Sequence, residues 1–175
     1  MYRACLINDT EQITSLIGKI GYVNFDDGLI GACEGGNLDA AILMIKHGAT
    51  NFTTGLLCAC EKGHFELAKL MLDNNATYHD GALAFACSGG NMNIVKLMIE
   101  TAASAKCTCD WNWGLAFACI GGNINIAKFM IENGATDFNR GLLGACEKGH
   151  LNIVELMIDN GATNLDEGLK IRISA

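Results

Sequence analysis

The sequence predicts an all-α protein, an α-solenoid built from stacked helix-turn-helix repeats. One phrase recurs along the chain, as GLIGACEGGN, GLLCACEKGH, GLAFACIGGN and GLLGACEKGH. Successive Ala-Cys pairs are spaced by 28, 27, 27, 32 and 27 residues, with their cysteines at Cys5, Cys33, Cys60, Cys87, Cys119 and Cys146. A methionine series keeps the same register, at Met44, Met71, Met98, Met130 and Met157. A fixed period of this length indicates supersecondary units that stack on one another.

The period divides the chain into six repeats and a remainder. We expect a single repeat domain over 1–175, with repeats at about 1–27, 28–54, 55–81, 82–113, 114–140 and 141–167. A partial C-terminal unit, 168–175, starts as the other repeats do but has no second helix after it. We expect this unit to be a half-repeat cap or the remnant of a longer parent, because the ends of solenoids need specialised units.

The first helix of the type repeat, 55–81, is predicted from Gly55 to Glu61. Its apolar residues follow the i, i+3, i+4 spacing of one helix face. We expect Thr54 to be its N-cap, as Asp27 is one repeat earlier, because short polar side chains satisfy the first free N–H groups of a helix. Gly63 should end the turn that follows, because glycine readily takes a positive φ.

The second helix of the same repeat is predicted from about Phe65 to Asp73. Leu67, Leu70 and Met71 are among its apolar residues, so this helix is too hydrophobic to stand without neighbours. Left-handed exits are expected after the second helices, at Gly48, Asn75, Gly134 and Gly161.

The connections between repeats carry a bulky residue in a fixed slot. We interpret these residues as plugs between neighbouring connections, at Phe25, Phe52, Trp111, Phe138 and Leu165, with Tyr78 and His79 covering the slot in the third repeat. Small alanines precede the cysteines at places where two helices approach closely. They are Ala32, Ala59, Ala86, Ala118 and Ala145.

Composition restricts the class of function. Half of the residues are hydrophobic, the net charge is −7 and the 12 basic residues are dispersed, which argues against a nucleic-acid partner. The first residues lack the pattern of a signal peptide, and no apolar run reaches the roughly 18 residues that span a membrane. Cysteines in one repeat slot suggest packing rather than disulfides. We therefore expect an intracellular, reducing, cytoplasmic location.

Two stretches carry a family resemblance. GHFELAKLMLDNNAT (63–77) and GHLNIVELMIDNGATN (149–164) closely resemble the second half of an ankyrin repeat, G-H-x-E-I-V-K-L-L-L-x-x-G-A-D-V-N. The short first helix ending in Ala-Cys is similar to the ankyrin segment T-P-L-H-x-A-A. The resemblance covers nearly the whole chain, and it implies an ankyrin-like α-solenoid that binds a partner protein.

Two departures from the family pattern modify the expected fold. The family period is about 33 residues, whereas the period here is 27, so shortened connections should replace the β-hairpins. We expect 135–140 to span one such gap. This trimmed form resembles ankyrin proteins of giant DNA viruses of amoebae, which would place it in the host cytoplasm. Repeat four has five extra residues within 100–113, where we expect the hairpin to be partly restored and Trp113 to stand just before the next helix.

No constellation of catalytic, cofactor-binding or metal-binding residues is found. We interpret the cysteine column as packing, because repeats about 10 Å apart are too far for disulfides. Cys107 and Cys109 are predicted to be exposed loop thiols, since C-x-C is not the spacing of a structural zinc site. His64 and His150 share a slot with asparagines, which favours a polar cap over a catalytic base. We therefore expect no enzyme, no cofactor and no metal.

The leading hypothesis is a protein-protein interaction scaffold. An unidentified protein would bind the concave face formed by the first helices and the connection tips, such as Asn112-Trp113 and Asn139-Arg140. The predicted contact residues are Glu61, Lys62, Phe85, Trp113, Phe117, Ile120, Arg140, Glu147 and Lys148. The apolar members would form an exposed patch, but the two phenylalanines could instead fill gaps between first helices. The alternative function is a self-assembling solenoid that stacks through its end repeats, although we expect a monomer.

Overall fold

The computed structural model describes residues 1–18, 23–77 and 79–164. Within these ranges the chain forms twelve α-helices and no strand, so the predicted all-α fold is confirmed. The chain divides into two compact units, Met1–Tyr78 and His79–Ala175, which are described separately. The helices of the first unit are α1 (Tyr2–Leu6), α2 (Thr10–Ile17), α3 (Phe25–Gly35), α4 (Leu38–Lys46), α5 (Phe52–Lys62) and α6 (Phe65–Asp73). Those of the second are α7 (His79–Gly89), α8 (Met92–Ser104), α9 (Trp111–Ile120), α10 (Ile124–Glu132), α11 (Phe138–Lys148) and α12 (Leu151–Asp159).

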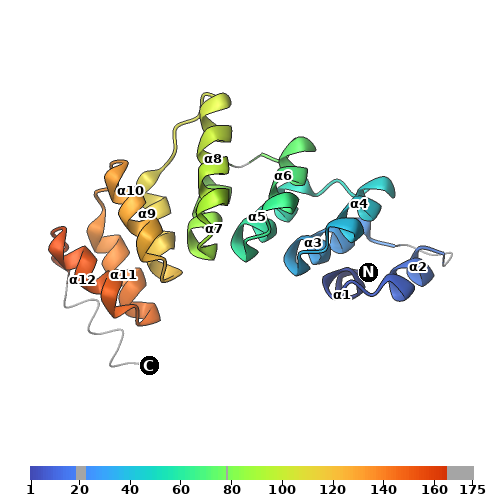
Figure 1. Cartoon of the computed structure of the whole chain (residues 1–175), viewed down its shortest axis with the longest axis horizontal. Coiled ribbons are helices and arrows are strands. Elements are labelled where there is room, and N and C mark those ends of the chain that lie inside the picture. The colour runs from blue at the N-terminus through green and yellow to red at the C-terminus, as the bar shows by residue number, and fades with distance from the viewer. Residues whose placement is uncertain (19–22, 78, 165–175) are drawn as a thin grey trace. The chain divides into compact units, whose positions relative to one another are not determined.

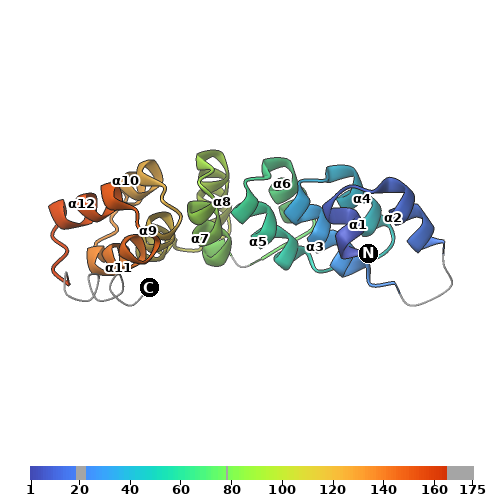
Figure 2. The same cartoon turned by 90° about the horizontal axis from the view of Figure 1, so that it is seen from below.

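Each repeat is a pair of helices (Figure 1). Within each unit, first helices pack on first helices and second helices on second helices. In the first unit α1 packs on α3 and α3 on α5, while α4 packs on α6. In the second unit α7 packs on α9 and α9 on α11, while α10 contacts α12. First helices and second helices thus form two separate layers within each unit, as the second view shows for α9 and α11 against α10 and α12 (Figure 2).

The first helices begin three residues earlier than the sequence suggested. Asn51 is the N-cap of α5, and its side chain accepts a hydrogen bond from the Thr54 N–H at 3.4 Å. Asn24 caps α3 in the same way through the N–H of Asp27, at 3.1 Å. The predicted caps Thr54 and Asp27 were therefore wrong, because an asparagine further upstream already satisfies their N–H groups.

The bulky slot residues belong to helices rather than to connections. Phe25, Phe52, Trp111 and Phe138 are each the first residue of a first helix, so their interpretation as plugs between connections was wrong. The Phe25 ring at the start of α3 stacks on His47, which follows α4, the second helix of the same pair, at a centroid distance of 5.2 Å. Of the predicted slot residues, Tyr78 and Leu165 lie outside the described residues, as do 165–175 as a whole.

Helix ends follow the glycine pattern closely. Gly63 has φ +80° and ends α5, and α6 spans Phe65–Asp73 as predicted. The expected left-handed exits after second helices are confirmed, with φ of +96° at Gly48, +63° at Asn75, +105° at Gly134 and +103° at Gly161. The connection predicted over 135–140 is shorter than expected, because α11 already begins at Phe138 behind its N-cap Asp137.

The core of each repeat explains the shared period of glycine, cysteine and methionine. A Cβ on Gly55 would lie only 2.7 Å from the sulfur of Met71 and 3.1 Å from the Cys33 sulfur of the preceding repeat. The Cys119 thiol likewise lies 3.8 Å from the sulfur of Met157 in the following repeat. At Gly55, Gly114 and Gly141 the methionine of the same repeat fills the space that the missing Cβ leaves open, whereas repeat four has Ala82 at this position.

The five extra residues of repeat four do not restore a hairpin. They lengthen α8 to 13 residues, whereas α6 and α10 have 9, and residues 105–110 then lead into α9. Neither strand nor bridge occurs in this segment, and Trp113 lies inside α9 rather than before it. The expectation was wrong because MNIVKLMIETAAS continues with good helix formers.

Candidate protein-binding surface

A polar slot after each first helix links neighbouring repeats. The Asn37 side chain donates hydrogen bonds to the carbonyl oxygens of Cys5 and Leu6 in the preceding repeat, at 2.8 and 2.9 Å. Asn123 does the same with the two corresponding carbonyls of α7, at 2.9 and 2.8 Å. Neither side chain caps its own helix. The side chain in this slot therefore donates hydrogen bonds to the carbonyl groups at the C-terminus of the first helix in the preceding repeat.

Histidines fill this slot in two other repeats. The Nε2 of His64 donates to the Glu34 carbonyl at 3.2 Å, and that of His150 donates to the Ile120 carbonyl at 3.1 Å. Gly36 has φ +78°, and a Cβ there would lie 2.6 Å from the His64 ring. The predicted polar cap is thus a link between repeats, which the sequence could not show because its partner is about 30 residues away.

A second link uses the second residue of each first helix. The Oδ1 of Asn112 accepts the N–H groups of Thr136 and Asp137 at 2.7 and 2.9 Å. Asp26 and Asn139 each accept two N–H groups of the next connection in the same way. These residues are turned toward their own chain, although the sequence suggested that Asn112 and Asn139 are tips that contact a partner. We call the two kinds of link, together, the junction bonds.

Asp80 is the exception to the second link. It occupies the position of Asp26 and Asn112, but its buried Oδ1 atom has no hydrogen-bond partner. The next connection, 105–110, follows the lengthened α8, and none of its N–H groups donates to this oxygen. The junction between α7 and α9 therefore lacks half of its junction bonds.

Aromatic side chains cover this same junction. The Phe85 ring of α7 contacts the Phe117 ring of α9 at a centroid distance of 5.8 Å and an interplanar angle of 57°. Trp113 stands edge-on to Phe117, at 6.0 Å and 72°. All three side chains are half-buried. We call these three residues the aromatic cluster. The structure thus brings together three of the predicted contact residues from two first helices.

Ile120 is the last residue of α9, one helical turn beyond Phe117. A Cβ on Gly144 of α11 would lie 2.7 Å from the Ile120 Cγ1, so Ile120 packs over this glycine. Ile120 is half-buried. The sequence left open whether the two phenylalanines fill gaps between first helices. Such packing accounts for part of their contacts and for part of those of Ile120.

The charged members of the predicted set are solvent-exposed. Arg140, Glu147 and Lys148 are exposed on α11, and Lys148 pairs with its neighbour Glu147 at 3.4 Å. Glu61 and Lys62 form an equivalent pair at 3.8 Å at the end of α5, in the other unit. Such exposed pairs contribute little to stability. Each pair lies at the end of a first helix of its own unit.

The cysteine column is buried, as its repeat position suggested. Cys5, Cys33, Cys60, Cys87 and Cys119 are all fully buried, whereas Cys146 is half-buried. Burial raises the pKa of the Cys33, Cys60 and Cys119 thiols to about 12, with a further contribution from Cys58 for the first two. These thiols are thus unreactive packing groups.

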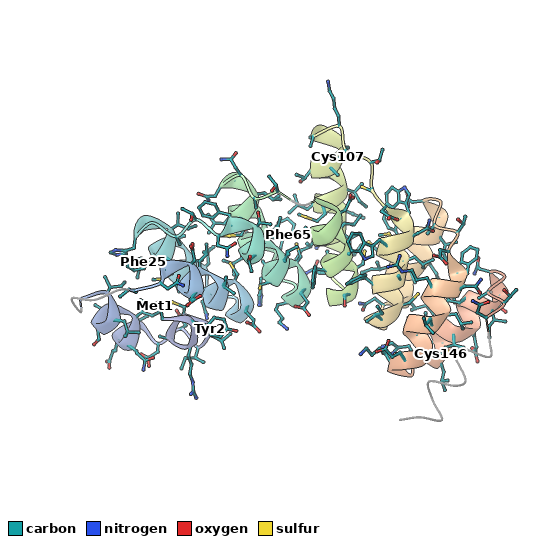
Figure 3. All side chains as sticks on the ribbon, turned by 180° about the vertical axis from the view of Figure 1, so that it is seen from behind. Met1, Tyr2, Phe25, Phe65, Cys107 and Cys146 are labelled. Atoms are coloured by element: carbon teal, nitrogen blue, oxygen red, sulfur yellow. The ribbon has the colours of Figure 1, made fainter. Side chains whose placement is uncertain are left out.

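The loop thiols differ from each other. Cys107 is exposed, as predicted, at the end of the α8 extension (Figure 3). Cys109 is half-buried, so its prediction as an exposed thiol was wrong, and burial, followed by the charge of Asp80, raises its pKa. Among the described residues, no group of three or more His, Cys, Asp or Glu side chains is arranged to hold a metal ion.

Comparisons with known proteins agree with the fold. The family model of ankyrin repeats, in three copies, matches residues 56–141. Of the solved structures, 164 chains match, among them the ankyrin repeat domain of human ASB11. That match has a TM-score of 0.63 and 18% sequence identity, and it covers 93% of this chain and 83% of the other. No curated protein matches the sequence.

The helices described above also bear on membrane insertion. None of those within the described residues is both long and apolar enough to cross a membrane. The likeness to the solved ankyrin domain concerns the arrangement of helix pairs in successive repeats. The chain therefore has the fold of an ankyrin repeat solenoid, and residues 56–141 within it match the ankyrin repeats as a family.

Proposed function

We propose that this protein is a non-enzymatic interaction scaffold whose first-helix face binds a partner protein. The observation that carries the proposal is the aromatic cluster, because half-buried aromatic rings from two neighbouring helices supply a large apolar contact area at low entropic cost. Ankyrin repeats generally mediate protein-protein interaction, which supports this class of function. The partner's hot spot would cover Phe85 and Trp113.

The charged residues of α11 would form the rim of this contact. Arg140 lies at the α11 position that corresponds to Trp113, and Glu147 at the one that corresponds to Ile120. A polar rim around an apolar centre is the usual arrangement of specific interfaces. Lys148 would affect association rate and salt dependence more than affinity. Glu61 and Lys62 would act in the same way on any contact that the partner makes with the first helices of the first unit.

A photo-crosslinker tests the proposal even while the partner is unidentified. A benzoylphenylalanine at Trp113 should capture a protein that the same group at Leu151 does not, because Leu151 is exposed on the second-helix layer instead. With that protein purified, Trp113→Ala should weaken binding about 30-fold, a hot-spot loss of about 2 kcal/mol. Leu151→Ser is the matched control and should bind normally. Equal capture from both positions, or normal binding by folded Trp113→Ala, would refute the proposal.

A second candidate function is self-assembly through the end repeats. Leu143, Leu151 and Ile158 of α11 and α12 are 37%, 56% and 41% exposed, which favours contact with another apolar surface. We nevertheless propose a monomer, and sedimentation at several concentrations decides between the two. A mass that rises with concentration and returns to that of the monomer in Leu151→Ser/Ile158→Ser would establish stacking.

The cell location that we propose is a reducing compartment such as the cytoplasm. Cys5, Cys33, Cys60 and Cys119 are buried thiols that form no disulfide. The shortened connections favour a relationship to ankyrin proteins of giant DNA viruses, which would make this the host cytoplasm. Imaging of the tagged protein in amoebae tests this location. A signal from the secretory pathway or from an organelle would contradict a cytoplasmic location.

A further inference from the structure

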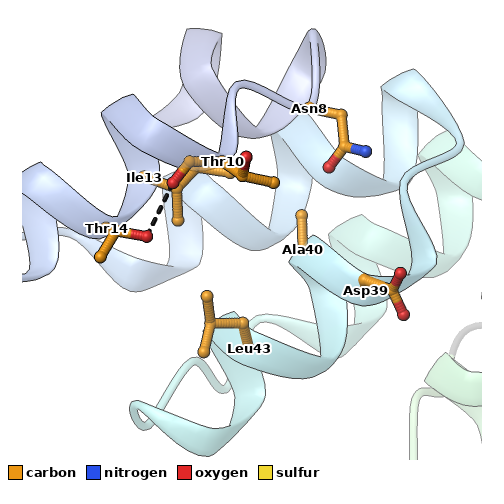
Figure 4. A pocket seen from close by; sticks show the side chains of 7 residues that line it. All are labelled: Asn8, Thr10, Ile13, Thr14, Asp39, Ala40 and Leu43. Atoms are coloured by element: carbon orange, nitrogen blue, oxygen red, sulfur yellow. Dashed lines mark hydrogen bonds between the residues drawn. The ribbon is translucent and has the colours of Figure 1, made fainter.

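A pocket separates α2 from α4 in the layer of second helices, away from the first-helix face. It has a volume of about 160 Å³, comparable to the cavity of about 150 Å³ that holds benzene in a protein core. Figure 4 shows Ala40 and Leu43 pointing from α4 toward α2, which contributes Ile13. Ala40 and Ile13 are 4% and 2% exposed, so the pocket has an apolar floor.

The pocket exists because one repeat lacks a large side chain. Ala40 is the third residue of its second helix, where the four later repeats have Leu67, Ile94, Ile126 and Ile153. In those repeats the side chain is at most 2% exposed. The second repeat thus leaves open a space that a branched aliphatic group of about four carbons occupies elsewhere in this chain.

The rim of the pocket is polar and acidic. Asp39, Asn8 and Thr10 line it, and Asp39 is exposed and makes no ion pair among the described residues. The Thr14 hydroxyl is already used, because it donates to the Thr10 carbonyl at 2.7 Å. The lining therefore offers oxygen acceptors and a carboxylate but no cationic group.

We propose that this pocket binds a small branched alkyl group that carries a protonated amine. The alkyl part fills the space beside Ala40, Ile13 and Leu43, and burial of that apolar surface provides most of the affinity. The ammonium group remains at the rim, where Asp39 supplies the opposite charge and Asn8 an amide oxygen. Neither the fold nor the proposed partner contact at the aromatic cluster requires such a site.

Three probes of equal shape and different charge test the proposal. Methyl NMR of the full chain is recorded during titration with 3-methylbutylamine, 3-methylbutanol and 3-methylbutanoate at neutral pH. The Ala40 and Leu43 methyl signals should shift saturably with the amine, with a dissociation constant on the order of millimolar for so small a ligand. The alcohol should bind about two- to fivefold more weakly, as for loss of one exposed ion pair, and the carboxylate more weakly still.

Two variants separate the two halves of the site. Ala40→Leu places in the pocket the residue that Leu67 provides in the next repeat, so it should fold and lose all binding. Asp39→Asn should bind the amine and the alcohol equally, whereas Asp73→Asn, at the far end of α6, should bind as the unchanged protein does. Amine binding that survives in Ala40→Leu, or no saturable shift at either methyl, overturns the site. An amine preference that survives in Asp39→Asn overturns the role of the carboxylate.

Discussion

At the scale of single residues, several repeats place a glycine against the methionine of the same repeat, whereas repeat four has Ala82 at the glycine position. Gly55 in the first helix and Met71 in the second lie against each other across one repeat, and a Cβ at position 55 would lie 2.7 Å from the sulfur. The same arrangement holds for Gly114 with Met130 and Gly141 with Met157, at 2.7 and 2.6 Å. Glycine disfavours a helix by about 1 kcal/mol relative to alanine, so the close contact outweighs propensity at these sites.

Gly55→Ala should therefore lower the free energy of unfolding, despite the gain in helix propensity. We expect a net loss of about 1–2 kcal/mol by urea titration, because overpacking costs about 1–3 kcal/mol. In a Met71→Ala background the same change should become neutral or stabilising, since the obstructing sulfur is gone. Gly18→Ala, where a Cβ meets only ordinary contacts at 3.6 Å or more, is the control and should not destabilise. A loss of equal size in both backgrounds would contradict this explanation.

The buried thiols predict how stability depends on pH. The folded pKa of Cys33, Cys60 and Cys119 is about 12 and lies above the ordinary value of 9.0, so the folded state holds protons that the unfolded state releases. Their contribution is complete below pH 9 and is lost as the pH rises from 9 toward 12. Each thiol should add about 1.4 kcal/mol per pH unit to the fall in unfolding free energy in that range. Cys60→Ala should reduce this slope, whatever its effect at neutral pH, and an unchanged slope between pH 9 and about 10.5 would disprove the assignment.

At the scale of secondary-structure elements, the junction bonds join successive first helices. In α9 the Asn112 side chain receives two N–H groups of the next connection, whereas in α7 the equivalent Asp80 Oδ1 receives none. The two positions form a natural comparison within one unit, because they share a register and differ in their partners.

Asn112→Ala should destabilise the second unit by about 1–2 kcal/mol, the net value of two hydrogen bonds. Asp80→Ala should cost much less, or stabilise, because an unpartnered buried oxygen is already unfavourable. Amide hydrogen exchange of Thr136 and Asp137 reports the first change directly, since their N–H groups lose their acceptor. Equal losses in the two variants would mean that the side-chain oxygens are not what holds the junctions.

At the scale of the whole molecule, the sequence predicts what is local or repeated, and misses what depends on another repeat. The period could be predicted because it is a repetition in the sequence. The helix pairs, the bounds of α6 and the glycine exits could be predicted because each depends on residues within a few positions. The hydrogen bonds by which Asn37 and His64 link repeats could not be predicted, because their acceptors lie about 30 residues earlier in the chain. An alignment of the repeats could have suggested it, since this position is Asn or His in the second to sixth repeats.

The same reasoning applies to the candidate binding surface. Phe85 and Phe117 share one column, so their contact could be anticipated, and Trp113 follows from helix spacing. The contact of Ile120 with Gly144 could not be anticipated, because nothing within α9 explains it. The lengthening of α8 was missed for a different reason, because the comparison with a longer family repeat suggested a hairpin where local helix propensity prevails.

The junction between α7 and α9 keeps the hydrogen bonds of Asn123 but has aromatic contacts in place of the bonds that Asp80 would make, and this difference gives it its own temperature dependence. Apolar association weakens on cooling, whereas the bonded junctions depend mainly on hydrogen-bond geometry. As a solution is cooled, the contact of Phe85 and Trp113 with Phe117 should therefore loosen before the bonded junction between α9 and α11 does. A partner that covered the same rings would act as a clamp on this junction, so occupancy of the surface and cold resistance of the second unit would rise together.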